Sequence, residues 1–134
     1  MSPVMVTRAP ARGAPVLLLV DDNEDDLALL KHALSSENFQ ILTASSPTAG
    51  FELLARHGAD IVVSDYQMPG MNGVEFLGNV RKLYPGIVRV VATGGDEMPT
   101  LTSAINHAGI HKFLSKNWDP ERLRAEVRAA FQQT

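Results

Sequence analysis

Four short apolar runs, each closed by a polar or charged residue, constrain most strongly what this chain can fold into. The runs are rich in leucine and β-branched residues, and they cover residues 16–20, 61–65, 87–92 and 112–115. Short, continuously apolar runs are typical of strands that are buried on both faces of a parallel sheet. One more strand, the second in chain order, is expected at residues 39–44.

Helix signals separate these strands. Leu27, Leu30 and Leu34 lie at helical spacing after the first strand. Capping signals mark the starts of the later helices: Ser46 with Pro47, Asn72 with Glu75, Pro99, and Asp119 with Pro120. Gly58 and Gly109 mark the ends of the second and fourth helices. This alternation predicts an α/β fold: a flavodoxin-like, doubly wound, five-stranded parallel sheet of order 2-1-3-4-5 with five helices, in a three-layer sandwich.

Length and composition limit the class of protein. The 134 residues suit one domain, and we expect residues 15–134 to form it, after a disordered tail at residues 1–14 that is rich in Pro, Ala, Gly and Arg. The absence of cysteine excludes disulfides and cysteine-bound zinc. The net charge of -3 argues against nucleic-acid binding by this domain. No apolar stretch approaches the ~20 residues of a membrane span, so a cytoplasmic protein is the simplest interpretation.

Acidic residues follow two strands that the predicted order makes neighbours. Asp21 and Asp22 follow the first strand, and Asp65 ends the third. Two unit charges ~4 Å apart repel by about 4 kcal/mol at an effective dielectric constant near 20, so such a cluster would lose a charge by protonation or recruit a cation. Oxygen ligands favour Mg²⁺. We expect direct ligation by Asp22 and Asp65, a water-mediated contact from Asp21, and a further oxygen from the backbone carbonyl of Gln67.

Asp65 is the candidate nucleophile at this edge of the sheet. A carboxylate can attack a phosphoryl group and form an aspartyl-phosphate. Lys116, after the fifth strand, and Thr93, after the fourth, are placed to contact the oxygens of that group.

These residues, taken in their order along the chain, resemble the pattern of a known family. The chain resembles, over about residues 15–132, the receiver domain of two-component response regulators, the CheY-like family. The matching features, in order, are Asp21-Asp22-Asn23-Glu24, Asp65-Tyr66-Gln67-Met68-Pro69-Gly70-Met71-Asn72-Gly73, Thr93, and Phe113-Leu114-Ser115-Lys116 before Trp118-Asp119. Any one alone is weak, but the four in order, each at a strand end, are specific.

The resemblance implies a role for each matching residue. Asp21 and Asp22 would hold Mg²⁺, Asp65 would accept phosphate from a histidine kinase or phosphotransfer domain, and Thr93 and Lys116 would contact that phosphate. The domain would catalyse only its own phosphorylation and dephosphorylation, so it would not be an enzyme in the ordinary sense.

The resemblance also implies a switch. Phe113 would turn inward when the threonine moves toward the phosphate, which would alter the face formed by the fourth helix, fifth strand and fifth helix. An output domain or effector protein would read that face, and a homodimer through it is a further expectation.

The chain departs from the family pattern at two positions. Asn117 stands where relatives usually carry a proline, commonly after a cis peptide bond. A cis bond before a non-proline residue costs ~2.5–4 kcal/mol, so we expect a trans bond between Lys116 and Asn117. Gly95 stands where many relatives have a larger side chain beside the path of attacking water.

Two other functions remain open. A receiver-like interaction module that works without phosphorylation is the main alternative, and its support is the replacement of that proline by Asn117. A phosphatase of the haloacid-dehalogenase type would need a second aspartate two residues after the nucleophile, where Gln67 stands.

Overall fold

One parallel sheet forms the centre of the molecule in the computed structural model, which describes residues 14–94 and 109–132. Its strand order is β2-β1-β3-β4-β5, as the sequence predicts. In chain order the strands are β1 (Val16–Val20), β2 (Gln40–Ala44), β3 (Ile61–Asp65), β4 (Val88–Thr93) and β5 (Lys112–Ser115). The second strand begins at Gln40, one residue after the expected start at Phe39. The Phe39 ring packs against Phe131 with ring centroids 4.7 Å apart.

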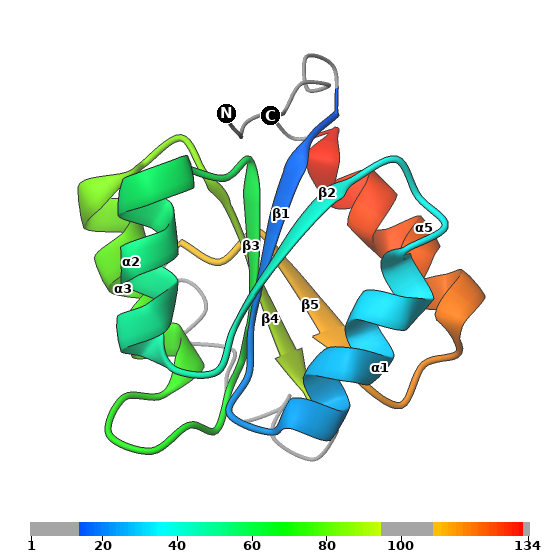
Figure 1. Cartoon of the computed structure of the whole chain (residues 1–134), viewed down its shortest axis with the longest axis horizontal. Helices are drawn as coiled ribbons and strands as arrows, with labels where there is room; N and C mark the ends of the chain where they lie inside the picture. Colours follow the sequence, from blue (N-terminus) through cyan, green and yellow to red (C-terminus); the bar gives the residue numbers. More distant parts are fainter. Residues whose placement is uncertain (1–13, 95–108, 133–134) are drawn as a thin grey trace, which may run out of the picture.

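Helices cover both faces of the sheet. The described helices are α1 (Glu24–Leu34), α2 (Pro47–His57), α3 (Gly73–Leu83) and α5 (Pro120–Phe131). Figure 1 shows α1 and α5 on one side of the sheet and α2 and α3 on the other. The predicted fourth helix falls on residues 95–108, outside the described residues, and nearly all of the predicted tail does so too.

Local capping groups start the helices where the sequence indicates. The Ser46 side chain accepts a hydrogen bond from the Ala49 N–H at 3.1 Å, with Pro47 in the first turn of α2. Asn72 and Glu75 form a reciprocal capping box at the start of α3. Each cap satisfies backbone N–H groups that have no partner within the helix.

Alternate residues of β1 face opposite helix layers. Leu17 and Leu19 belong to the core under α1 and α5, whereas Leu18 and Val20 belong to the core under α2 and α3. All four are almost fully buried, as the continuous apolar run requires. No helix among residues 14–94 and 109–132 combines the length and apolar character needed to cross a membrane.

The register of the sheet gathers the polar strand ends at one edge. Asp21 follows β1 directly, and the β1–β3 register sets it beside Asp65 at the end of β3. On the other side of β3, Asp65 pairs with Ala92 of β4. The Lys116 N–H donates to the Thr93 carbonyl at 2.8 Å and so continues the β4–β5 pairing past the strand end.

Candidate functional site

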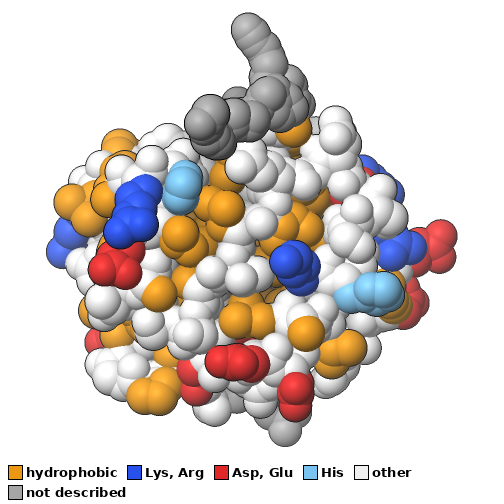
Figure 2. Space-filling model, viewed as in Figure 1, with side chains coloured by type: hydrophobic (Ala, Val, Ile, Leu, Met, Phe, Trp, Pro, Cys, Tyr) orange, Lys and Arg blue, Asp and Glu red, His pale blue; other side chains and the backbone are white. Residues whose placement is uncertain are grey.

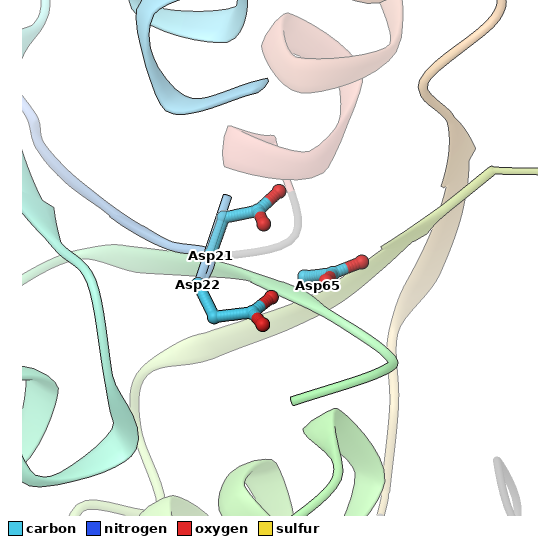
Figure 3. Close-up of side chains that lie close together, drawn as sticks. All are labelled: Asp21, Asp22 and Asp65. Carbon is cyan, nitrogen blue, oxygen red and sulfur yellow. The ribbon is translucent and has the colours of Figure 1, made fainter. Parts of the chain in front are cut away.

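Three carboxylates converge at the carboxyl edge of the sheet. Oxygens of Asp21, Asp22 and Asp65 all lie within 4.8 Å of one another. Figure 3 shows the three side chains reaching the same space from the ends of two neighbouring strands. Asp21 and Asp65 are buried and Asp22 is exposed, so the cluster is open to solvent on one side.

Backbone groups fix Asp21 in this cluster. Its N–H donates to the Ala44 carbonyl of β2 at 3.1 Å. Its Oδ1 accepts a hydrogen bond at 3.0 Å from the N–H of Asn23, the N-cap residue of α1. The turn from β1 into α1 therefore holds the Asp21 carboxylate toward the site.

The loop after β3 folds back onto the backbone of Asp65. The Gly73 N–H, at the start of α3, donates to the Tyr66 carbonyl at 2.7 Å. An open pocket beside this loop is lined by Asp22, Tyr66, Gln67, Met68, Pro69 and Asn72. The structure thus brings Gln67 near the exposed side of the acidic cluster, and its carbonyl as a metal ligand stays a prediction.

Lys116 extends its ammonium group into the cluster from the end of β5. Its Nζ lies 3.0 Å from Asp21 Oδ2, 3.0 Å from Asp65 Oδ1 and 2.7 Å from Asp26 Oδ2. The Lys116–Asn117 peptide bond is trans, as expected. The replacement of proline by Asn117 therefore leaves the lysine aimed at Asp65.

The charges of this site act on one another. Burial raises the pKa of Asp65 from its ordinary 3.8 to about 6; the hydrogen bond from Lys116 lowers it, and the nearby charges of Asp21 and Asp22 raise it. Burial alone would lower the pKa of Lys116, but hydrogen bonds to Asp26, Asp21 and Asp65 raise it above the ordinary value of 10.5. Lys116 therefore stays protonated, and it offsets part of the repulsion among the acids.

Thr93 and Phe113 lie on the two strands next to this cluster. Thr93 is buried at the end of β4, between the strands that carry Asp65 and Lys116. Phe113 of β5 is half-buried and packs against the core on the α2 and α3 side. Their positions suit the phosphate-contact and switch roles that the sequence suggested, and these roles stay predictions.

The donor set fits a hard divalent cation. The described acidic cluster offers carboxylate oxygens alone, with neither histidine nor cysteine among its members. Mg²⁺ prefers such oxygens and accepts one or two carboxylates while it keeps several waters. An acidic pocket that could hold Mg²⁺ is therefore present.

Comparison with known proteins gives the family. Residues 17–128 match the family described as response regulator receiver domain. The chain belongs to this family. Receiver domains of this kind are the phosphate-accepting components of two-component signalling, and this chain is one of them.

Relatives and solved structures agree with this membership. The chain is 38% identical over 114 residues to the hydrogenase transcriptional regulatory protein HoxA of Cupriavidus necator, covering 85% of this chain and 23% of HoxA. It is 33% identical over 118 residues to the transcriptional regulatory protein GlrR of Escherichia coli, covering 88% of this chain and 26% of GlrR. The signal receiver domain of an HD domain-containing protein from Pseudomonas fluorescens superimposes with a TM-score of 0.83 at 32% identity, covering 90% of this chain and 96% of that domain. The chain therefore spans about a quarter of the length of these two regulators and nearly all of an isolated receiver domain.

Two residues of this receiver site did not emerge from the sequence as functional contacts. Asp26 makes the shortest contact to Lys116, and the Asn117 side chain donates to the Gly94 carbonyl at 2.6 Å. Helical spacing offered a signal for Asp26, because it lies four residues before the buried Leu30 and so on the inner side of α1.

Proposed function

We propose that Asp65 is the phosphate acceptor of this receiver domain and that Mg²⁺ binds at Asp21, Asp22, Asp65 and the backbone carbonyl of Gln67. One observation carries the proposal: the Asp65 carboxylate shares one site with two acids that suit a cation and with the ammonium group of Lys116, 3.0 Å away. A phosphoryl group on Asp65 would lie near the positive charges of a bound cation and of Lys116.

The reaction supported by this arrangement is an in-line phosphoryl transfer. An Asp65 oxygen attacks phosphorus, and an O–P bond forms as the P–N bond of a phosphohistidine or the P–O bond of an acyl phosphate breaks, with the electron pair leaving on the donor. When bound, Mg²⁺ neutralises charge on the phosphoryl oxygens. Lys116 donates to one of those oxygens and the Thr93 hydroxyl donates to another.

Movement of Thr93 toward the phosphate would be the event that switches the domain. The space it leaves would admit Phe113, which lies on the neighbouring strand. This would shift the equilibrium between two conformations of the face made of the predicted fourth helix, β5 and α5. An output domain, an effector protein or a second copy of the chain would bind one conformation better than the other.

The partners follow from the same chemistry. A histidine kinase or phosphotransfer domain supplies the phosphoryl group, and the regulation of transcription by HoxA and GlrR, as their names state, suggests an output of that kind. The net charge of -3 argues against nonspecific nucleic-acid binding by this domain. We place the domain in the cytoplasm, and we assign it no turnover beyond its own phosphorylation and dephosphorylation.

A Phos-tag gel tests the proposed acceptor. Incubation with acetyl phosphate and Mg²⁺ should produce a shifted band in the unmodified protein, and EDTA should abolish it. The band should be lost in Asp65→Asn and kept in Asp25→Asn, which changes an exposed acid of α1 by the same charge. An equal band in Asp65→Asn would refute the assignment, and no band in any variant together with no binding of beryllofluoride would favour the phosphate-independent module.

A further inference from the structure

The ammonium group of Lys116 has three carboxylate partners, and one of them lies outside the acidic cluster. Asp26 Oδ2 is 2.7 Å from Nζ, whereas Asp21 and Asp65 are each 3.0 Å away. Asp26 belongs to the first turn of α1 and is not one of the three grouped acids that suit a metal. Its contact with Lys116 thus needs an explanation of its own.

The hydrogen-bonding capacity of Lys116 is already filled by these contacts. A protonated lysine has three N–H donors, and here three carboxylates surround them. A phosphoryl oxygen on Asp65 can receive an N–H only if one present partner gives it up. Asp26 is the most exposed of the three, with 34% of its side chain accessible against 1% for Asp21 and 9% for Asp65, so water compensates its loss best.

We propose that Asp26 is a positioning residue that holds the Lys116 ammonium in the unphosphorylated state and competes for it with the incoming phosphoryl group. This inference rests on the proposed function of Asp65. Asp26 thereby restrains phosphorylation, and release of Lys116 from Asp26 accompanies the arrival of phosphate.

The charge of Asp26 affects cation and phosphoryl binding in opposite directions. A negative charge next to Lys116 adds to the field of the three acids, which attracts Mg²⁺ and repels an anionic phosphoryl group. Figure 2 shows acidic side chains along the lower rim of the molecule, the end toward which β4 and β5 point in Figure 1. Neutralising Asp26 should therefore weaken Mg²⁺ binding and strengthen binding of a phosphoryl mimic, whereas general damage to the site would weaken both.

Asp25 provides a matched control. It precedes Asp26 in the same first turn of α1 and is exposed. Its replacement by asparagine removes the same net charge and the same favourable interaction with the helix N-terminus. Because Asp25 lies four residues before the exposed Leu29, it is on the outer side of the helix.

The experiment measures two affinities in three proteins: the unmodified chain, Asp26→Asn and Asp25→Asn. Mg²⁺ is titrated alone, and beryllofluoride is then titrated at saturating Mg²⁺, each by isothermal calorimetry. The single tryptophan, Trp118, lines a cavity together with Asp26 and Lys116 and provides a fluorescence readout for the same titrations. Relative to Asp25→Asn, Asp26→Asn should bind beryllofluoride about two- to fivefold more tightly and Mg²⁺ more weakly, in keeping with a half-buried ion pair.

The possible results separate the inference from the proposed function. If Asp26→Asn matches Asp25→Asn, or binds both ligands more weakly, the role of Asp26 is wrong while the proposed function stands. If the unmodified chain binds Mg²⁺ but not beryllofluoride, the proposed function fails and the inference fails with it. Asp26→Ser, with a smaller neutral side chain, should reproduce the opposite shifts, and their absence there would also overturn the inference.

Discussion

Asn117 shows how a single side chain can replace the proline that relatives carry after the lysine. Its N–H donates to Ser115 Oγ at 3.1 Å, and its Nδ2 donates to the Gly94 carbonyl at 2.6 Å. A proline at this position could make neither bond, because it has no N–H and no side-chain donor. The asparagine therefore joins the loop after β4 to the loop after β5, and these loops begin next to Thr93 and Lys116.

Asn117→Ala should loosen this connection. Loss of the bond to Gly94 should lower the free energy of unfolding by about 1 kcal/mol, the usual net value of one hydrogen bond. It should also weaken beryllofluoride binding, because Lys116 is then held less firmly. Urea unfolding measures the free energy of unfolding, and isothermal calorimetry at saturating Mg²⁺ measures the affinity for beryllofluoride.

Asn38→Ala is a suitable comparison for that variant. Asn38 is exposed in the turn before β2, at the opposite edge of the sheet from the site. It should change neither quantity appreciably. An Asn117→Ala protein as stable and as active in binding as Asn38→Ala would show that the connection to Gly94 has no effect on the site.

At the scale of elements, the start of α3 determines where the end of β3 can lie. A Cβ atom at Gly73 would stand 2.1 Å from the Asp65 carbonyl oxygen and 3.0 Å from the Tyr66 Cα. No flexible side chain is available to yield there, since both atoms belong to the backbone. A glycine is required because α3 begins in direct contact with the residue that we propose accepts phosphate.

Gly73→Ala should therefore disturb fold and site together. The clash must shift either α3 or the end of β3, so we expect a loss of about 2–3 kcal/mol of stability, the upper range for overpacked positions. Beryllofluoride binding should fall strongly as Asp65 moves. Thermal unfolding and calorimetry measure the two effects.

Gly86→Ala is the matched control for this element. Gly86 lies in the turn before β4, and a Cβ atom there would meet nothing within 4 Å. Its stability should change by less than about 1 kcal/mol, through the lower entropy of the unfolded chain. Equal behaviour of the two alanine variants would contradict the close packing at Gly73.

At the scale of the whole molecule, two kinds of feature could be predicted from the sequence: those set by residues close by in the chain, and those set by the topology of the sheet. The helix starts at Pro47, Gly73 and Pro120 follow from caps and first-turn residues close by in the chain. The convergence of Asp21 and Asp65 followed from topology, because parallel strands place their carboxyl ends at one edge. These features needed no knowledge of side-chain packing.

The contacts of Lys116 could not be derived in the same way. Three acids, Glu24, Asp25 and Asp26, stand in the first turn of α1, where negative charge is favoured in any case. Which of them reaches the lysine depends on how α1 packs beside β5 and α5, and that is a tertiary property. The bond from Asn117 to Gly94 likewise depends on the relative position of two loops.

The raised pKa of Asp65 links this site to the stability of the whole molecule. Burial is the largest cause, and it brings the pKa to about 6 from the ordinary 3.8 that applies in the unfolded chain. Between these two values the folded protein binds a proton that the unfolded chain has released. Stability from this group is therefore gained as the pH falls and lost as the pH rises through about 6.

The metal-free protein should show this linkage when it is compared with Asp65→Asn in EDTA. At pH 8 the buried carboxylate is charged, so the asparagine variant should be the more stable of the two, by on the order of 2–3 kcal/mol at most. The difference should shrink as the pH is lowered through 6 and should vanish near pH 4, where the carboxyl is neutral. Saturating Mg²⁺ at pH 8 should reverse the order, because the ion binds the folded state of the unmodified protein more tightly. Urea unfolding at a series of pH values measures all of these differences. A difference that stays constant from pH 8 to pH 4 would mean that ionisation of the Asp65 carboxyl group does not lower the free energy of unfolding.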